Sequence, residues 1–211
     1  MWNWTETYSP GIGFAIWVLE HDGLRIHPFD MHPEGDGRLR ALGLNESSWR
    51  LWIGAITEAE AGFADFVPRH DIRALTPGER EEMRRRDEQR EPVWCWAGES
   101  RVQTALDELW LTYRTIGEGW ISQLTSAKRQ SRITADEERR LWRQLEPLHD
   151  RLATLRVYPV DYGHRAELAI PPESCLVSIG ARDADGTRYA DSVFEAARQL
   201  ASIKGEEPTA S

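Results

Sequence analysis

Three residues between positions 27 and 32 carry side chains that suit a metal ion. His27, Asp30 and His32 offer two imidazoles and a carboxylate within six residues. Neutral imidazole and carboxylate are ligands for zinc, iron or manganese, and such a set leaves one coordination position for water or substrate. The spacing matches no established metal motif, and turn-forming Pro, Gly and Asp surround it, so a solvated loop is the alternative interpretation.

A second set of titratable residues lies between two segments that we expect to be strands. Asp161, His164 and Glu167 would meet in a cleft if the connecting loop folds back, and they then suit general acid–base chemistry. Turn formation or ion pairing is the alternative.

Cys95 lies between two tryptophans before a predicted helix start. A catalytic thiol needs a lowered pKa, whereas a cysteine packed among indole rings is an apolar core residue.

The segment 128–143 is locally basic, with six basic residues against three acidic ones. Trp142 lies in the same segment and offers a ring for stacking on a base. Because acidic residues are interleaved with the basic ones, a solvated or ion-paired face is the alternative to phosphate binding. The candidate nucleic-acid contacts are Lys128, Arg129, Arg132, Arg139 and Arg143.

The elements that position these residues differ along the chain. The apolar run 14–19 predicts a strand buried on both faces, followed by a turn and a second strand over 24–27; residues 2–5 add a third. Large apolar residues at helical spacing predict a helix over 49–63. Thr76, with glutamate three residues later, predicts a second helix start.

The helix that begins at Thr76 is polar on every side. Residues 79–91 contain six acidic residues, five arginines and Met83 as the only apolar one. A helix of this kind packs little, so we expect a solvated connector or arm.

Two apolar stripes at helical spacing, over 102–124 and 141–155, predict an antiparallel helical hairpin, with a kink at Pro147. Further elements are predicted beyond the hairpin: strands over 157–160, 166–170 and 175–179, and a helix over 189–203.

These elements predict an α+β fold: a small antiparallel sheet from N- and C-terminal segments, packed with a long central helical hairpin. The predicted organisation is one compact domain overall, in four parts. They are N-terminal strands plus a helix in 1–75, a charged helical connector in 76–92, the hairpin with strands and a terminal helix in 93–204, and a flexible tail in 205–211.

Composition narrows the function classes. Of 211 residues 40% are hydrophobic, which is enough for a packed core, and the net charge of −9 repels nucleic-acid phosphates at long range. The apolar stretch 11–19 is too short to cross a bilayer, so no membrane partner is expected. Two cysteines and no secretory leader predict a cytoplasmic protein with reduced thiols. No cofactor is predicted, because no nucleotide-binding motif occurs.

The chain has ten tryptophans, and all but two of its 26 basic residues are arginine, a bias that indicates a GC-rich bacterial coding sequence. Indole and guanidinium groups are enriched at the energetic centres of interfaces, although tryptophan also fills cores. We therefore predict a non-enzymatic accessory or adaptor subunit that holds another protein, or a copy of itself, in a multi-protein system. A small metal-dependent hydrolase or nuclease, or a nucleic-acid-binding accessory protein, is the alternative. The predicted partner-binding residues are Trp2, Trp4, Trp49, Trp52, Arg84, Arg85 and Arg86.

Overall fold

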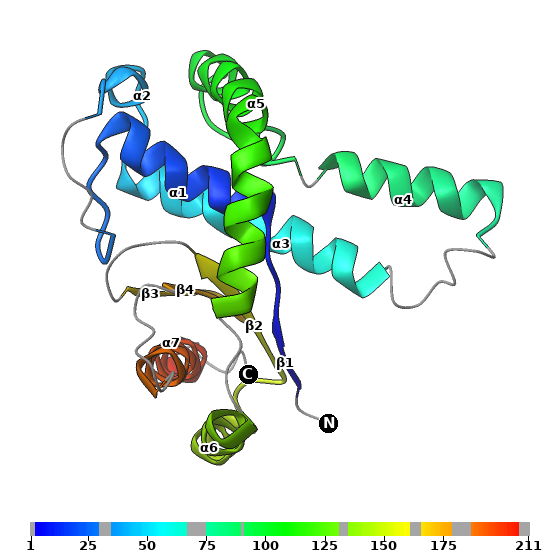
Figure 1. Ribbon diagram of the computed structural model, residues 1–211, viewed down its shortest axis with the longest axis vertical. Helices are drawn as coiled ribbons and strands as arrows, with labels where there is room; N and C mark the ends of the chain where they lie inside the picture. Colours follow the sequence, from blue (N-terminus) through cyan, green and yellow to red (C-terminus); the bar gives the residue numbers. More distant parts are fainter. Residues whose placement is uncertain are drawn as a thin grey trace. The chain divides into compact units, whose positions relative to one another are not determined.

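The computed structural model forms two compact units. Unit 1 comprises Met1–Tyr8, His27–Phe29 and Gly117–Ser211, and unit 2 comprises Ser9–Ile26 and Asp30–Ile116. In chain order, unit 2 is therefore an insertion after the first strand of unit 1; Figure 1 shows the elements of both. The structure describes residues 3–29, 35–66, 75–89, 91–130, 135–160, 166–178 and 187–206.

Unit 1 contains a four-stranded mixed sheet in the order β1-β2-β4-β3. Its strands are β1 (Asn3–Glu6), β2 (Thr154–Val160), β3 (Glu167–Ile170) and β4 (Ser174–Ser178). β1 pairs with β2 and β2 with β4 in parallel, whereas β3 and β4 are antiparallel. The prediction of a small sheet from both ends of the chain is confirmed, but the prediction that it is antiparallel is wrong.

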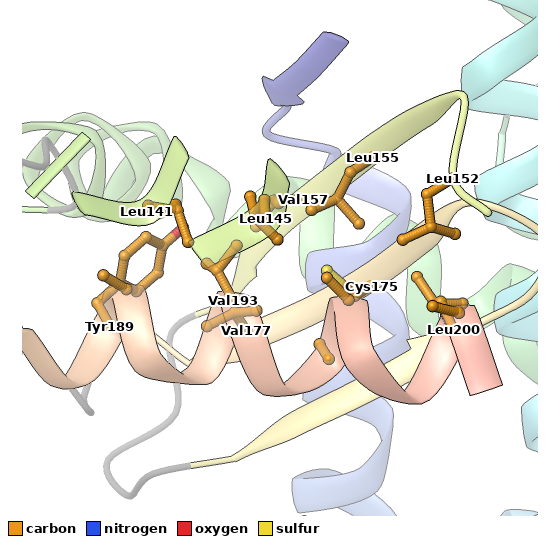
Figure 2. Close-up of a cluster of buried hydrophobic side chains, with 14 residues drawn as sticks. Leu141, Leu145, Leu152, Leu155, Val157, Cys175, Val177, Tyr189, Val193 and Leu200 are labelled. Carbon is orange, nitrogen blue, oxygen red and sulfur yellow. The ribbon is translucent and has the colours of Figure 1, made fainter. Parts of the chain in front are cut away.

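Two helices supply the rest of the unit 1 core. α7 (Thr187–Glu206) packs on β3 and β4, and α6 (Ala135–Leu145) packs on α7. Figure 2 shows how their apolar side chains meet those of the strands. Burial of each such side chain stabilises the fold by about 1.5–3 kcal/mol. The labelled members of the cluster are Leu141, Leu145, Leu152, Leu155, Val157, Cys175, Val177, Tyr189, Val193 and Leu200.

A hydrogen bond connects the short N-terminal strand to the last helix. The Tyr189 hydroxyl, on a fully buried side chain, donates to Glu6 Oε1 at 2.8 Å. Burial, together with the neighbouring Glu6 carboxylate, raises the pKa of Tyr189 well above its usual value. The phenol therefore remains protonated and able to donate at all physiological pH values.

Unit 2 is built from helices. They are α1 (Pro10–Asp22), α2 (Arg38–Ala41), α3 (Glu46–Phe66), α4 (Pro77–Gln89) and the first half of α5 (Ser100–Gln130). α1 packs against α3, and Phe14 lies at the centre of an aromatic cluster, with ring centroids 5.9 Å from Trp52 and 5.1 Å from Trp110. The buried Asp22 carboxylate accepts hydrogen bonds from the backbone N–H groups of Leu39 and Arg40, and so caps α2.

The segment 14–19, predicted as a strand, lies within α1. The Ser9 side chain accepts a hydrogen bond from the Ile12 N–H, and Pro10 occupies the first turn, where its missing N–H is not needed. Gly23, with φ of 64°, ends the helix in the left-handed conformation that glycine tolerates. A continuous apolar run fits a helix buried on most sides as well as a central strand, and here the caps decide. The predicted strand over 24–27 does not form either.

The predicted helix over 141–155 is too long. α6 ends at Leu145, and a 3₁₀ turn over Glu146–Leu148 that contains Pro147 replaces the predicted kink. Leu155 consequently belongs to β2. The helical hairpin stays a prediction, because the described contacts of α6 are with α7 and with the 3₁₀ turn. The four-part organisation of the chain likewise stays a prediction.

We expect Tyr189→Phe to lower the free energy of unfolding by about 1–3 kcal/mol, because the half-buried Glu6 carboxylate loses its hydrogen bond from the buried phenol. Urea denaturation measures this loss. Glu6→Gln, which keeps an acceptor oxygen, is the control and should cost less. An unchanged urea midpoint in Tyr189→Phe would show that this bond contributes nothing.

Candidate functional site

The candidate site begins with two well-capped helices of unit 2. At the start of α3, Asn45 Oδ1 accepts from the Ser48 N–H and Ser48 Oγ accepts from the Asn45 N–H, both at 3.0 Å. At the start of α4, the Thr76 N–H and hydroxyl donate to Glu79 Oε2 at 2.8 and 2.7 Å. Both arrangements are reciprocal capping boxes. The predicted helix start at Thr76 is confirmed.

α4 runs back antiparallel to the end of α3 (Figure 1) and packs against it. None of its residues is buried, so it contributes nothing to an apolar core. Ion pairs between neighbouring turns support it instead: Arg84 pairs with Glu81 and Glu88, and Glu82 pairs with Arg85 and Arg86. This agrees with the prediction of a solvated polar helix.

A groove of about 270 Å³ lies between the two helices. Its floor on α3 has the small residues Ala59 and Gly62, and a Cβ built on Gly62 would meet no atom within 4 Å. We call this hollow the α3–α4 groove. It is lined by Ala59, Gly62, Phe63, Arg85, Arg86 and Gln89.

Glu82 orients the two arginines of the groove. Its carboxylate accepts from Arg85 Nε and Nη2 at 2.9 and 2.8 Å, and from Arg86 Nε at 2.6 Å. These hydrogen bonds, that from Arg85 first, lower the pKa of Glu82 to about 2. Arg86 Nη1 also donates to the Gly62 carbonyl at 3.2 Å, which ties α4 to α3. The guanidinium groups are thus held in place at the groove across the physiological pH range.

An exposed tryptophan follows α4. The side chain of Trp94 is 67% exposed, and its backbone N–H donates to the Glu91 carbonyl in a turn. The next residue, Cys95, donates its Sγ–H to the carbonyl of Gln89 at 3.5 Å. Because Gln89 is among the residues that line the groove, this contact ties the turn to the last residue of α4. The interpretation of Cys95 as a cysteine between two core tryptophans is wrong for Trp94, which is exposed, whereas Trp96 is buried. The position of Trp94 in a Pro- and Gly-containing turn after a polar helix is the signal that could have found it.

Trp49 and Trp52 are core residues, not the exposed anchors that the sequence analysis predicted. They are 0% and 1% exposed, and their indole N–H groups donate to the carbonyls of Ala15 and Pro92. Their three-residue spacing places both on the face of α3 that is turned to the aromatic cluster. Trp4 is half-buried against the unit 1 core, and Trp2 lies outside the described residues.

The predicted metal and acid–base sets fall largely outside the described residues. His27 is described and exposed, whereas Asp30 and His32 are not described. Glu167 is half-buried in β3, and Asp161 and His164 are not described. Within the described ranges, no three His, Cys, Asp or Glu side chains gather in a way that would hold a metal ion. Both sets stay predictions.

The predicted nucleic-acid contacts are described only in part. Arg139 and Arg143 lie on α6, where Arg139 pairs with Asp136 and is 70% exposed. Of the remaining candidates, Lys128 and Arg129 lie in the part of α5 beyond residue 115, whose side chains are not described, and Arg132 lies outside the described residues. The one ion pair seen among these described candidates is of the interleaved kind that the alternative interpretation expects.

Neither cysteine has the lowered pKa of a catalytic thiol. Burial, with a smaller contribution from the charge of Glu60, raises the pKa of Cys95 to about 11. Cys175 is fully buried in the unit 1 core, and burial raises its pKa as well. Both thiols are therefore protonated at neutral pH and lack the character of a catalytic nucleophile; Cys175 is a core residue, whereas Cys95 is half-buried.

Comparison with protein-family models, with curated proteins and with solved structures finds no match for this chain. Among the described helices, none has the length and apolar character needed to cross a bilayer. The site must therefore be interpreted from its own geometry.

We expect Trp52→Ala to destabilise the protein by about 3–5 kcal/mol, because it leaves a cavity in the aromatic cluster and removes the bond to Pro92. Trp94→Ala should change stability by less than about 1 kcal/mol, since its ring is exposed. Thermal and urea unfolding compare the two variants. Equal losses would contradict the assignment of one ring to the core and the other to the surface.

We expect Cys95 to react with iodoacetamide at pH 8 about a hundredfold more slowly than free cysteine, because far less of it is thiolate. The rate should rise about tenfold per pH unit up to about pH 10, which peptide mass spectrometry measures. Cys175 should react only after unfolding. A Cys95 rate that levels off near pH 9 would contradict the raised pKa.

Proposed function

We propose that this chain is a non-enzymatic accessory protein that binds a protein partner through α4 and the turn that follows it. The observation that carries the proposal is Trp94, a large aromatic side chain that is 67% exposed in the turn after α4. Tryptophan and arginine are the residues most enriched among those that dominate binding energy at interfaces. The setting that we propose, from the arginine bias and the two free cysteines, is the bacterial cytoplasm.

The character of α4 supports this proposal. Exposed ion pairs contribute little to stability, and α4 has no buried residue. The helix thus adds little to the stability of its own chain. A well-capped helix that the core does not require is suited to presenting charged side chains to another macromolecule.

The charged surface of α4 also supports a binding role better than a catalytic one. Arg84, Arg85 and Arg86 are all engaged with glutamates of the same helix. These pairs orient the three guanidinium groups on the surface of α4. Complementary charges on two proteins set the specificity and the association rate of their interface. Of the residues first predicted to bind a partner, these three stay in the proposal.

The test is affinity purification of the tagged full-length chain from its source organism, with recovered proteins identified by mass spectrometry. Trp94→Ala should reduce recovery of a specific partner at least tenfold, because a central aromatic anchor is lost. The fold should survive this change, since the ring is exposed.

A charge reversal on α4 has a matched control on α7. Arg85 bonds Glu82, and Arg198 bonds Glu195, each through Nε and Nη2 across three residues of one helix. We expect Arg85→Glu to weaken recovery of the partner and Arg198→Glu to leave it unchanged, because α7 lies in the other unit and outside the proposed surface.

The partner can also be a second copy of this chain, and light scattering of the purified chain tests this by measuring its oligomeric state. The proposal is contradicted if Trp94→Ala recovers the same proteins as the unaltered chain and both are monomeric at the same concentration.

A further inference from the structure

The size of the α3–α4 groove limits what it can hold. Pockets for drug-sized ligands and cofactors measure about 300–1,000 Å³. The groove, at about 270 Å³, falls below that range and lies open between two helices of unit 2. Its volume suits one or two amino-acid side chains of a bound peptide.

The charged residues that line the groove are both arginines, and Glu82, which bonds them, is not among the lining residues. The lining has two guanidinium groups and the amide of Gln89, together with the ring of Phe63, and no carboxylate of the described residues belongs to it. Arg85 uses Nε and Nη2 on Glu82, and among the described residues its Nη1 donates no hydrogen bond. Arg85 thus keeps a donor for an incoming group, and Phe63 supplies an apolar ring in the same lining.

The arginines are also ordered before any ligand arrives. Glu82 bonds both of them, and Arg86 is further held by the Gly62 carbonyl. Side chains that are already fixed lose less conformational entropy when they bind, which favours association. Guanidinium groups fit carboxylates in geometry as well as in charge.

From these observations we propose that the α3–α4 groove binds an acidic peptide segment of the partner, with an aspartate or glutamate at Arg85 and Arg86 and an adjacent apolar side chain against Phe63. This inference rests on the proposed function and adds the chemistry of the partner. Arg85 supplies the free donor, and the open floor at Gly62 admits the peptide side chain.

The experiment uses a random 12-residue peptide library displayed on phage, selected on the full-length chain. Enriched peptides are synthesised, and their affinities are measured by fluorescence anisotropy. We expect enrichment of Asp and Glu next to an apolar residue. Replacing that Asp or Glu by Asn or Gln should weaken binding about tenfold, the loss of one charge-assisted contact.

Two variants of the groove have matched controls. Gly62→Leu should fill the groove and reduce affinity at least tenfold, whereas Gly54→Leu, at a second open glycine of α3, should not. In both substitutions the new Cβ has no other atom within 4 Å, and replacing a glycine inside a helix favours the helical conformation. Arg85→Glu should likewise weaken binding, and Arg198→Glu should not.

The outcomes separate this inference from the proposed function. Selected peptides without acidic enrichment, affinities unchanged in Gly62→Leu, or no selected peptide at all would overturn the inference. If Trp94→Ala abolishes partner recovery while Gly62→Leu and Arg85→Glu do not, the proposed function stands and the acidic-peptide site falls. Synthetic phosphopeptides are measured in the same assay, and a groove that binds them but not the acidic peptides would also overturn the inference.

Discussion

Unit 1 depends on the parallel pairing of β1 with β2. Parallel neighbours cannot be joined by a tight turn and need a long crossover connection. Here Asn3 pairs with Thr154, and the crossover contains all of unit 2. A strand of four residues holds its place because its edge is bonded to β2 and because Glu6 accepts from the buried Tyr189. The candidate groove is thus carried by an insertion in a small sheet.

Local signals in the sequence predicted much of the fold. The capping box at Thr76, the strand around Pro159 and the amphipathic last helix are all recognisable from a few neighbouring residues. The segment 14–19 was mispredicted because apolar runs have no period when every side is buried. The parallel direction of the sheet could not be predicted, since it depends on the pairing of residues far apart in the chain.

The candidate site was predictable only in part. Arg85 and Arg86 stand out as charges on a polar helix, but the groove needs α4 to pack against α3, which local patterns do not specify. The tryptophans show the same limit: Trp52 is buried and Trp94 is exposed. Residue type alone does not separate a core ring from a surface ring, because tertiary contacts decide burial.

The insertion of unit 2 also affects the order in which the chain can fold during synthesis. The ribosome produces β1 first and β2 only after unit 2 is complete. Unit 2 can therefore gather its helices while the N-terminal strand still lacks a partner. An unpaired strand edge is a hazard for aggregation until its neighbour arrives. In this chain the unpaired strand has only four residues, but it lacks its partner for as long as the ribosome takes to make unit 2.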